Sequence, residues 1–172
     1  MPNILINKIL KYDHRIFELI VQREKYFLRR FLTIFTHLGD GLLWVFCYIL
    51  FYLFGQESLR HVILVIIFAQ IFGLIMIIIL RYITKRERPS PIRYILPWNR
   101  YSFPSVHTTR VFIIATIIGK EHPSWLIFLL MGALTIGFSR IYLKKHYPLD
   151  VFLGMIVGTF CAVISLNLNF FL

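Results

Sequence analysis

The feature that most constrains the fold of this chain is a series of long apolar runs separated by short polar connections. About 20 consecutive apolar residues are enough for a helix to cross a bilayer. Hydrophobic residues make up 58% of the 172 residues and the mean hydropathy is +0.73, which leaves too little polar surface for a soluble globule. The sequence therefore predicts an all-α, polytopic membrane helix bundle. Its five expected transmembrane helices cover residues 31–54, 61–83, 104–119, 124–143 and 150–172.

A further helical pattern precedes these runs. Between residues 4 and 20, apolar residues recur at roughly helical spacing among charges such as Lys8, Lys11 and Asp13. This pattern suits an amphipathic helix lying at the membrane interface, and a helix packed against the bundle fits it equally well. The chain has no internal repeat and no linker composition, so we expect a single membrane-embedded domain over residues 1–172.

The charge of the chain indicates its partner. The formal net charge is +11, but apolar spans interrupt the basic residues, which are not gathered on one soluble face. An anionic lipid bilayer is therefore the expected partner, and nucleic acid is not. The sequence indicates no obligatory protein partner. The longest connection, residues 84–103, is rich in proline and is expected to be a loop that frames the entrance to a pocket.

Three polar fragments carry the candidate chemistry: Arg81 to Arg88-Pro89, the segment Pro104-Ser105-Val106-His107, and Ser139-Arg140 followed by His146 and Asp150. Guanidinium groups bind phosphate oxygens bidentately. One imidazole can attack phosphorus, a second can protonate the leaving oxygen, and a carboxylate can hold the attacking ring in one tautomer. The residue types therefore favour an enzyme of phosphoryl transfer.

Simple topology predicts that these fragments meet. If all five spans cross the membrane, the N-terminus, the loop 84–103 and the connection 144–149 lie on the same side. All three polar fragments then converge at one end of the bundle. Residues almost seventy positions apart reach one site in this arrangement without any assumed contact.

These fragments resemble the motifs of the type 2 phosphatidic acid phosphatase family of membrane lipid phosphatases, which shares its site with vanadate-dependent haloperoxidases. The family pattern is Lys, six residues, Arg-Pro; then Pro-Ser-Gly-His; then Ser-Arg, five residues, His, three residues, Asp. All internal spacings are kept here. Two residues depart from the pattern, since Arg81 replaces lysine and Val106 replaces glycine. The first exchange keeps the charge, and the second loses easy access to positive φ.

The resemblance implies a role for each motif residue. His146 would be the nucleophile that forms a phosphohistidine, Asp150 its orienting partner, and His107 the acid that protonates the departing oxygen. No cofactor and no metal are implied. The phosphate-binding groups would come from Arg81, Arg88, Ser105, Val106 and Arg140.

Two rival interpretations remain open from the sequence. His107, His146 and Asp150 could form a metal-binding triad, although three arginines aimed at the same pocket would repel a divalent cation. A non-enzymatic transporter or scaffold could instead hold anionic headgroups on its basic face, and it would have no special need for His146 or Asp150. The sequence assigns no role to Asp40 and His37, and it suggests only headgroup contact for Arg110.

Substrate and sidedness are less constrained. The resemblance implies a phosphorylated membrane lipid, with lipid A 1-phosphate preferred over phosphatidylglycerol phosphate and undecaprenyl diphosphate because the small chain has a broad basic rim. It also implies the bacterial inner membrane, with the active site on the periplasmic face. The positive-inside rule opposes this orientation, because the basic N-terminal segment and the loop 84–103 lie on the same side as the site.

Overall fold

A computed structural model describes residues 2–90 and 97–168 of the chain. This part consists of α-helices, short 3₁₀ turns and irregular connections, and it contains no β-strand. The turns are His37–Gly39, Pro97–Arg100 and Pro123–Trp125. The helices are α1 (Pro2–Val21), α2 (Tyr26–Thr36), α3 (Gly41–Phe54), α4 (Glu57–Thr84), α5 (Val106–Glu121), α6 (Leu126–Tyr142) and α7 (Pro148–Asn167).

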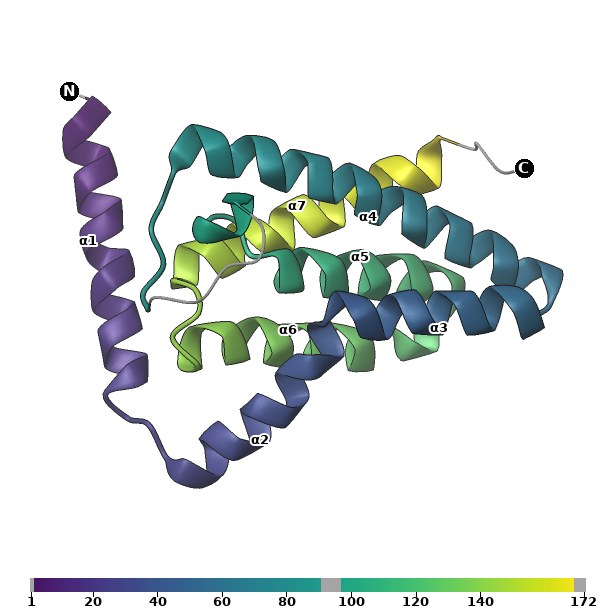
Figure 1. Cartoon of the computed structure of the whole chain (residues 1–172), viewed down its shortest axis with the longest axis horizontal. Helices are drawn as coiled ribbons and strands as arrows, with labels where there is room; N and C mark the ends of the chain where they lie inside the picture. The colour runs from purple at the N-terminus through teal and green to yellow at the C-terminus, as the bar shows by residue number, and fades with distance from the viewer. Residues whose placement is uncertain (1, 91–96, 169–172) are drawn as a thin grey trace.

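Helices α3 to α7 run side by side as a bundle, and α1 lies across one end of it (Figure 1). Helix α5 is central and packs against α4, α6 and α7. One apolar core joins α5 to α3, α4 and α7, and a second lies between α5 and α6. The outer surface is also apolar, with Leu42 87% and Phe128 73% exposed. An apolar interior combined with an apolar exterior confirms the predicted membrane bundle.

Three of the five predicted runs correspond to helices that could cross a membrane. Three described segments are long and apolar enough to do so by themselves, namely Glu57–Thr84, Pro123–Tyr142 and Pro148–Asn167. The last predicted run continues to residue 172, and residues 169–172 lie outside the described part. Helix α5 has only 16 residues, fewer than the other three segments, and it is buried along most of its length. Its polar N-terminal end therefore starts among protein side chains and not in open lipid.

The first predicted run, residues 31–54, is not one continuous helix. Helices α2 and α3 are bent by 48° at a break formed by the turn His37–Gly39 and by Asp40. Asp40 has extended backbone angles, φ −72° and ψ 139°, and its N–H donates to the carbonyl of His37 at 2.9 Å. A glycine on each side of Asp40 lowers the helix propensity at the same point. The break gives α3 a new N-terminus next to His107 and Arg110 of α5.

Helix α1 combines the two interpretations that its sequence left open. Its apolar side chains are largely exposed, as in Ile4 (74%) and Leu5 (64%), whereas Asp13 is only 5% exposed. Among the described side chains of α1, Asp13 is the one that is buried. The helix therefore presents apolar residues outward, as expected at a membrane interface, and directs a carboxylate into the bundle.

Close packing of α5 on α7 depends on two glycines. A Cβ added at Gly158 would lie 2.5 Å from the carbonyl oxygen of Thr109, and one added at Gly154 would lie 2.9 Å from that of Ser105. Both distances are shorter than van der Waals contact. The spacing Gly154-xxx-Gly158 therefore brings the two backbones together, as small residues do in membrane bundles.

We predict that Gly158→Ala lowers the free energy of unfolding by about 2 kcal/mol, because the new methyl group meets a backbone oxygen that cannot move aside. Gly132→Ala is the matched control, since a Cβ at Gly132 has no atom within 4 Å and alanine favours a helix more than glycine does. Thermal unfolding of purified protein in detergent measures both variants. Equal stability of the two would contradict the close approach of α5 and α7.

Candidate functional site

A polar cavity of about 260 Å³ lies at the end of the bundle where α4 and α6 finish and α5 and α7 begin. Its lining includes two histidines, His107 and His146, together with Trp98, Asn99 and Val106. No carboxylate is present among the described lining residues. The charged side chains of the lining are all cations: Arg81, Arg88, Arg110, Arg140 and Lys145. Such a cavity is suited to an anion with several oxygens.

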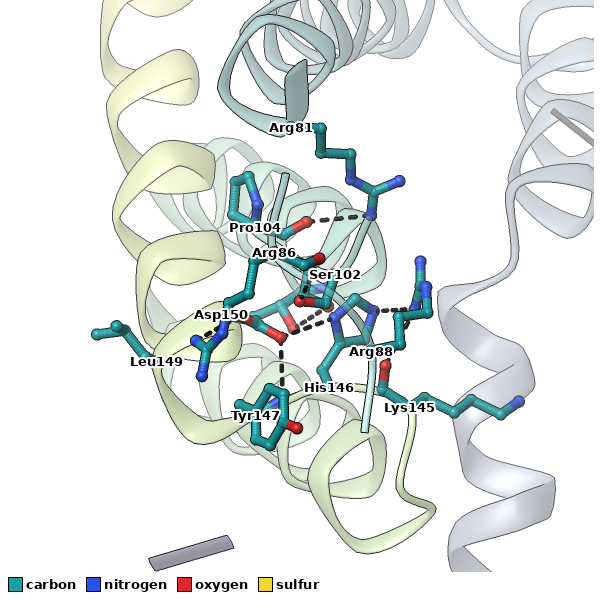
Figure 2. A network of polar contacts seen from close by, with 12 residues as sticks. Arg81, Arg86, Arg88, Ser102, Pro104, Lys145, His146, Tyr147, Leu149 and Asp150 are labelled. Atoms are coloured by element: carbon teal, nitrogen blue, oxygen red, sulfur yellow. Dashed lines mark hydrogen bonds and ion pairs between the residues drawn. The ribbon is translucent and has the colours of Figure 1, made fainter. Parts of the chain in front are cut away.

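His146 is held between a carboxylate and an arginine. It lies in the connection between α6 and α7 and is 1% exposed. Its Nδ1 is 3.5 Å from Oδ2 of Asp150, and its Nε2 is 3.1 Å from Nη1 of Arg88 (Figure 2). Because a guanidinium can only donate, Nε2 is the acceptor and the ring proton belongs on Nδ1, facing Asp150.

The surroundings of His146 also keep its ring neutral. Burial, followed by the charge of Arg88, lowers the pKa of His146 well below its ordinary value. The ring therefore stays unprotonated at neutral pH and over part of the acidic range. An unprotonated Nε2 beside a cation-lined cavity is the arrangement that a nitrogen nucleophile requires.

Asp150 is anchored by its position in α7. It is the third residue of that helix and is fully buried. Its Oδ2 accepts the N–H of Tyr147 at 2.9 Å, and its Oδ1 accepts Nη1 of Arg86 at 2.8 Å. Helix α7 begins at Pro148, two residues before the predicted run 150–172. An amide, a guanidinium and the helix N-terminus all stabilise the charged carboxylate next to His146.

Arg86 links this carboxylate to α1, a connection that the sequence analysis missed. The guanidinium forms an ion pair with Asp150 and lies over the ring of Tyr147, 4.3 Å from its centroid (Figure 2). It also forms an ion pair with Asp13 of α1. The second oxygen of Asp13 accepts the N–H of Leu149 at 2.8 Å. An aspartate among the mainly basic charges of the first 21 residues was the available sequence signal, but no spacing rule connects it with residues 86 and 150.

The arginines of the cavity are positioned by backbone and amide oxygens. Arg81 is completely buried, donates to Oδ1 of Asn99 and to the carbonyl of Pro104, both at 3.1 Å, and lies over the Trp98 ring. Arg140 donates to Oγ1 of Thr36 at 2.9 Å. In the described part of the chain, Nε of Arg81 and Nε of Arg140 have no hydrogen-bond partner. Both groups thus retain a donor for a ligand.

Two predicted phosphate-binding residues, Ser105 and Val106, lie at the start of α5. Ser105 is the N-cap of α5, where its hydroxyl accepts from the N–H and the hydroxyl of Thr108, and it is not one of the cavity-lining residues. Its contact with phosphate remains a prediction. Val106 lines the cavity as the first residue of α5. Lys85 and Lys144 are the described non-glycine residues with positive φ, so valine in place of glycine requires no left-handed backbone here.

His107 is paired with a residue that the sequence left unassigned. Its Nε2 is 2.8 Å from Oδ1 of Asp40, and the other oxygen of Asp40 is 2.7 Å from Nδ1 of His37. The two histidines of the cavity therefore have separate carboxylate partners. Arg110 also belongs to the cavity lining and donates to the carbonyl of Gly39 at 2.7 Å.

The metal triad considered from the sequence is not assembled. Within the described ranges, no three His, Cys, Asp or Glu side chains are grouped so that they could hold a metal ion. Asp150 contacts His146, whereas His107 contacts Asp40.

Similarity to known proteins covers most of the chain. Residues 58–171 match the family described as the PAP2 superfamily. The chain belongs to this family. Its fold is also that of Aquifex aeolicus LpxE, whose crystal structure is similar with a TM-score of 0.73 at 31% identity over 88% of this chain and 93% of that chain. Membership of the PAP2 superfamily supports a hydrolase.

Other relatives extend over different shares of the chain. Undecaprenyl-diphosphatase of Sulfolobus acidocaldarius is 24% identical over 164 residues, which are 92% of this chain and 79% of that protein. Lipid A 4'-phosphatase of Bacteroides thetaiotaomicron is 38% identical over 93 residues, 47% of this chain and 41% of that protein. A transmembrane PAP2 type phosphatidylglycerolphosphate phosphatase from Bacillus subtilis shares the fold, with a TM-score of 0.74 at 22% identity over 95% of this chain and 87% of that chain.

We predict that Asp13→Ala lowers the free energy of unfolding by about 2 kcal/mol, because it removes a buried partner of Arg86 and leaves the N–H of Leu149 without its acceptor. Glu18→Ala, an exposed carboxylate on the same helix, should change stability by less than about 0.5 kcal/mol. Thermal unfolding in detergent compares the two. A larger loss for Glu18→Ala would contradict the anchoring role of Asp13.

Proposed function

We propose that this PAP2 protein hydrolyses a phosphomonoester or pyrophosphate on a membrane lipid through a phosphohistidine intermediate. The observation that carries the proposal is the placement of His146, whose Nδ1 faces Asp150 and whose Nε2 lies at a cavity lined by cations. A lipid-binding scaffold has no need of such an oriented, neutral imidazole.

In the first step, Nε2 of His146 forms a bond to phosphorus as the bond to the lipid oxygen breaks. Asp150 stabilises the positive charge that develops on the ring. His107 donates a proton to the departing oxygen, so the lipid leaves as a neutral alcohol, or as a monophosphate if the substrate is a pyrophosphate. In the second step, water attacks the phosphohistidine, His107 takes up one of its protons, and phosphate and free His146 are released.

The arginines supply the electrostatic part of catalysis. Arg81, Arg88 and Arg140 approach the cavity from three different segments and would bind the oxygens of the transferring group. Three guanidinium charges at the phosphoryl group can do what magnesium ions do in kinases. We therefore propose that the reaction needs no divalent metal.

An apolar groove beside the cavity supports a lipid substrate. It has a volume of about 670 Å³, lies between α3, α4 and α5, and shares Val106 and Arg110 with the polar cavity. A hydrocarbon chain can lie in this groove while its phosphate reaches His146. Lipid A phosphate is our preferred substrate, because the cavity carries five cations and one relative is a lipid A 4'-phosphatase. Phosphatidylglycerol phosphate and undecaprenyl diphosphate are the other candidates to compare.

For localisation, we propose the bacterial inner membrane with the site on its outer face. Part of the basic excess at this end of the chain belongs to the phosphate cavity, because Arg81 and Arg140 are buried there. Phosphate binding requires these two arginines on whichever side of the membrane the site lies. They are therefore weaker evidence for a cytoplasmic orientation under the positive-inside rule than basic loop residues are.

We predict that purified protein releases phosphate from a lipid phosphate in excess chelator, and that His146→Ala abolishes this release. Rapid quenching with radiolabelled substrate should leave label on the wild-type protein and none on the variant, because the covalent bond requires the nucleophile itself. Lys120→Ala at the opposite end of the bundle is the control and should retain both activities. Turnover by His146→Ala would contradict the phosphohistidine, and no turnover by wild type on any candidate lipid would favour the scaffold.

We predict that Leu74→Trp raises KM for a long-chain lipid phosphate by about tenfold and leaves hydrolysis of soluble nitrophenyl phosphate within about twofold, because the indole fills part of the groove. Ile127→Trp is the matched control on an exposed face of α6, where 65% of the side chain is accessible. Equal effects of both substitutions on the lipid would contradict the assignment of the groove.

A further inference from the structure

We propose that Asp40, at the break between α2 and α3, is the positioning residue of His107, orients that ring for proton donation and favours its protonated form. This inference rests on the proposed function, in which His107 is the general acid. It assigns a role in the reaction to a residue that none of the family motifs contains.

The contact between the two side chains is specific. Oδ1 of Asp40 lies 2.8 Å from Nε2 of His107, within hydrogen-bonding distance. Among the described residues, Nδ1 of His107 has no hydrogen-bond partner, and the side chain keeps 21% of its accessible surface at the cavity. Nε2–H can thus donate to Asp40 while Nδ1–H remains available for the leaving oxygen.

The arrangement mirrors that of the nucleophile. His146 turns Nδ1 to Asp150 and Nε2 to the cavity, whereas His107 turns Nε2 to Asp40 and leaves Nδ1 for the substrate. The protonation requirement is opposite in the two cases. His146 must be neutral to attack, and His107 must carry two protons to act as an acid.

A carboxylate is needed at His107 because its other charged neighbours disfavour the imidazolium. Arg110 from α5, Arg140 from α6 and Lys145 from the following connection all line the same cavity. Each of these cations opposes a further positive charge on the ring. Asp40 supplies the compensating negative charge, and its contact with Nε2 also fixes the rotation of the ring.

The broken span is built closely around this contact. A Cβ added at Gly39 would lie 2.9 Å from Cδ2 of His107 and 3.1 Å from a methyl carbon of Ile136, so only glycine allows the break to approach the ring. The carbonyl of Gly39 accepts Nη1 of Arg110 at 2.7 Å, which ties the break to the first turns of α5. His37 occupies the second oxygen of Asp40 from the exposed side. The carboxylate is therefore held on both of its oxygens.

A double-mutant cycle on two substrates tests the proposal. Asp40→Asn, His107→Ala and the double variant are assayed in detergent with a lipid phosphate and with nitrophenyl phosphate, whose leaving group needs no acid. We expect Asp40→Asn to lower kcat on the lipid by about 10- to 100-fold with KM within about twofold, and to lower kcat on nitrophenyl phosphate by less than about threefold. The double variant should be no more than about twofold slower than His107→Ala. Glu57→Gln removes a carboxylate at the opposite end of the bundle and should leave both rates unchanged.

The outcomes separate this inference from the proposed function. The positioning role is overturned if Asp40→Asn slows both substrates equally. It is also overturned if the fold-loss of kcat in the double variant equals the product of the losses in the two single variants. In either case Asp40 acts through stability. If Asp40→Asn is as active as wild type while His107→Ala is slow on the lipid, the inference fails and the proposed function stands. Full lipid turnover by His107→Ala would instead remove His107 from its proposed role as the acid.

A second variant covers the case in which Asp40→Asn does not fold. Gly39→Ala retains the carboxylate but pushes a methyl group against the His107 ring. It should give the same leaving-group-dependent loss, larger on the lipid than on nitrophenyl phosphate. An equal loss on both substrates would overturn the positioning role.

Discussion

The site end of the bundle depends on one guanidinium, that of Arg86, which bridges two buried carboxylates. Asp150 belongs to α7 and Asp13 to α1, so this single side chain joins the segment after α4 to both helices. A buried arginine with one partner would be costly, and two carboxylates together with an aromatic face compensate its lost hydration. The same ion pair orients Asp150 next to His146. Stability and the geometry of the nucleophile therefore share one interaction.

Charge is divided between the cavity and the layer behind it. The cavity lining carries cations and histidines, whereas Asp150 and Asp40 lie behind His146 and His107 and contact those rings. An anion entering the cavity meets no described carboxylate. Each carboxylate contacts its own histidine, Asp150 through Nδ1 of His146 and Asp40 through Nε2 of His107, so the two rings turn different nitrogens to the cavity. The two proposed roles, nucleophile and acid, follow from this division.

The broken first span is the clearest case in which the fold departs from the hydropathy pattern. Residues 31–54 satisfy the length and composition of one transmembrane helix, yet the chain bends by 48° at His37–Asp40. The sequence contained the signal, a Gly-Asp-Gly segment inside an apolar run. Its meaning depends on what packs against it, because a polar break in a membrane segment is tolerated only where protein groups satisfy it. Here His107 and Arg110 of α5 do so.

The sequence by itself determined the membrane bundle and the motif residues that the structure brings to one cavity, among them Arg81, His107 and His146. These features follow from local rules of hydropathy and motif spacing. Only the tertiary structure decided that Asp13, Arg86 and Asp40 stand behind those residues and that α1 carries a buried carboxylate into the bundle. Those pairings join residues 64 to 73 positions apart across different helices. Their energy comes from burial and charge compensation, which exist only after the helices have packed, so no sequence spacing encodes them.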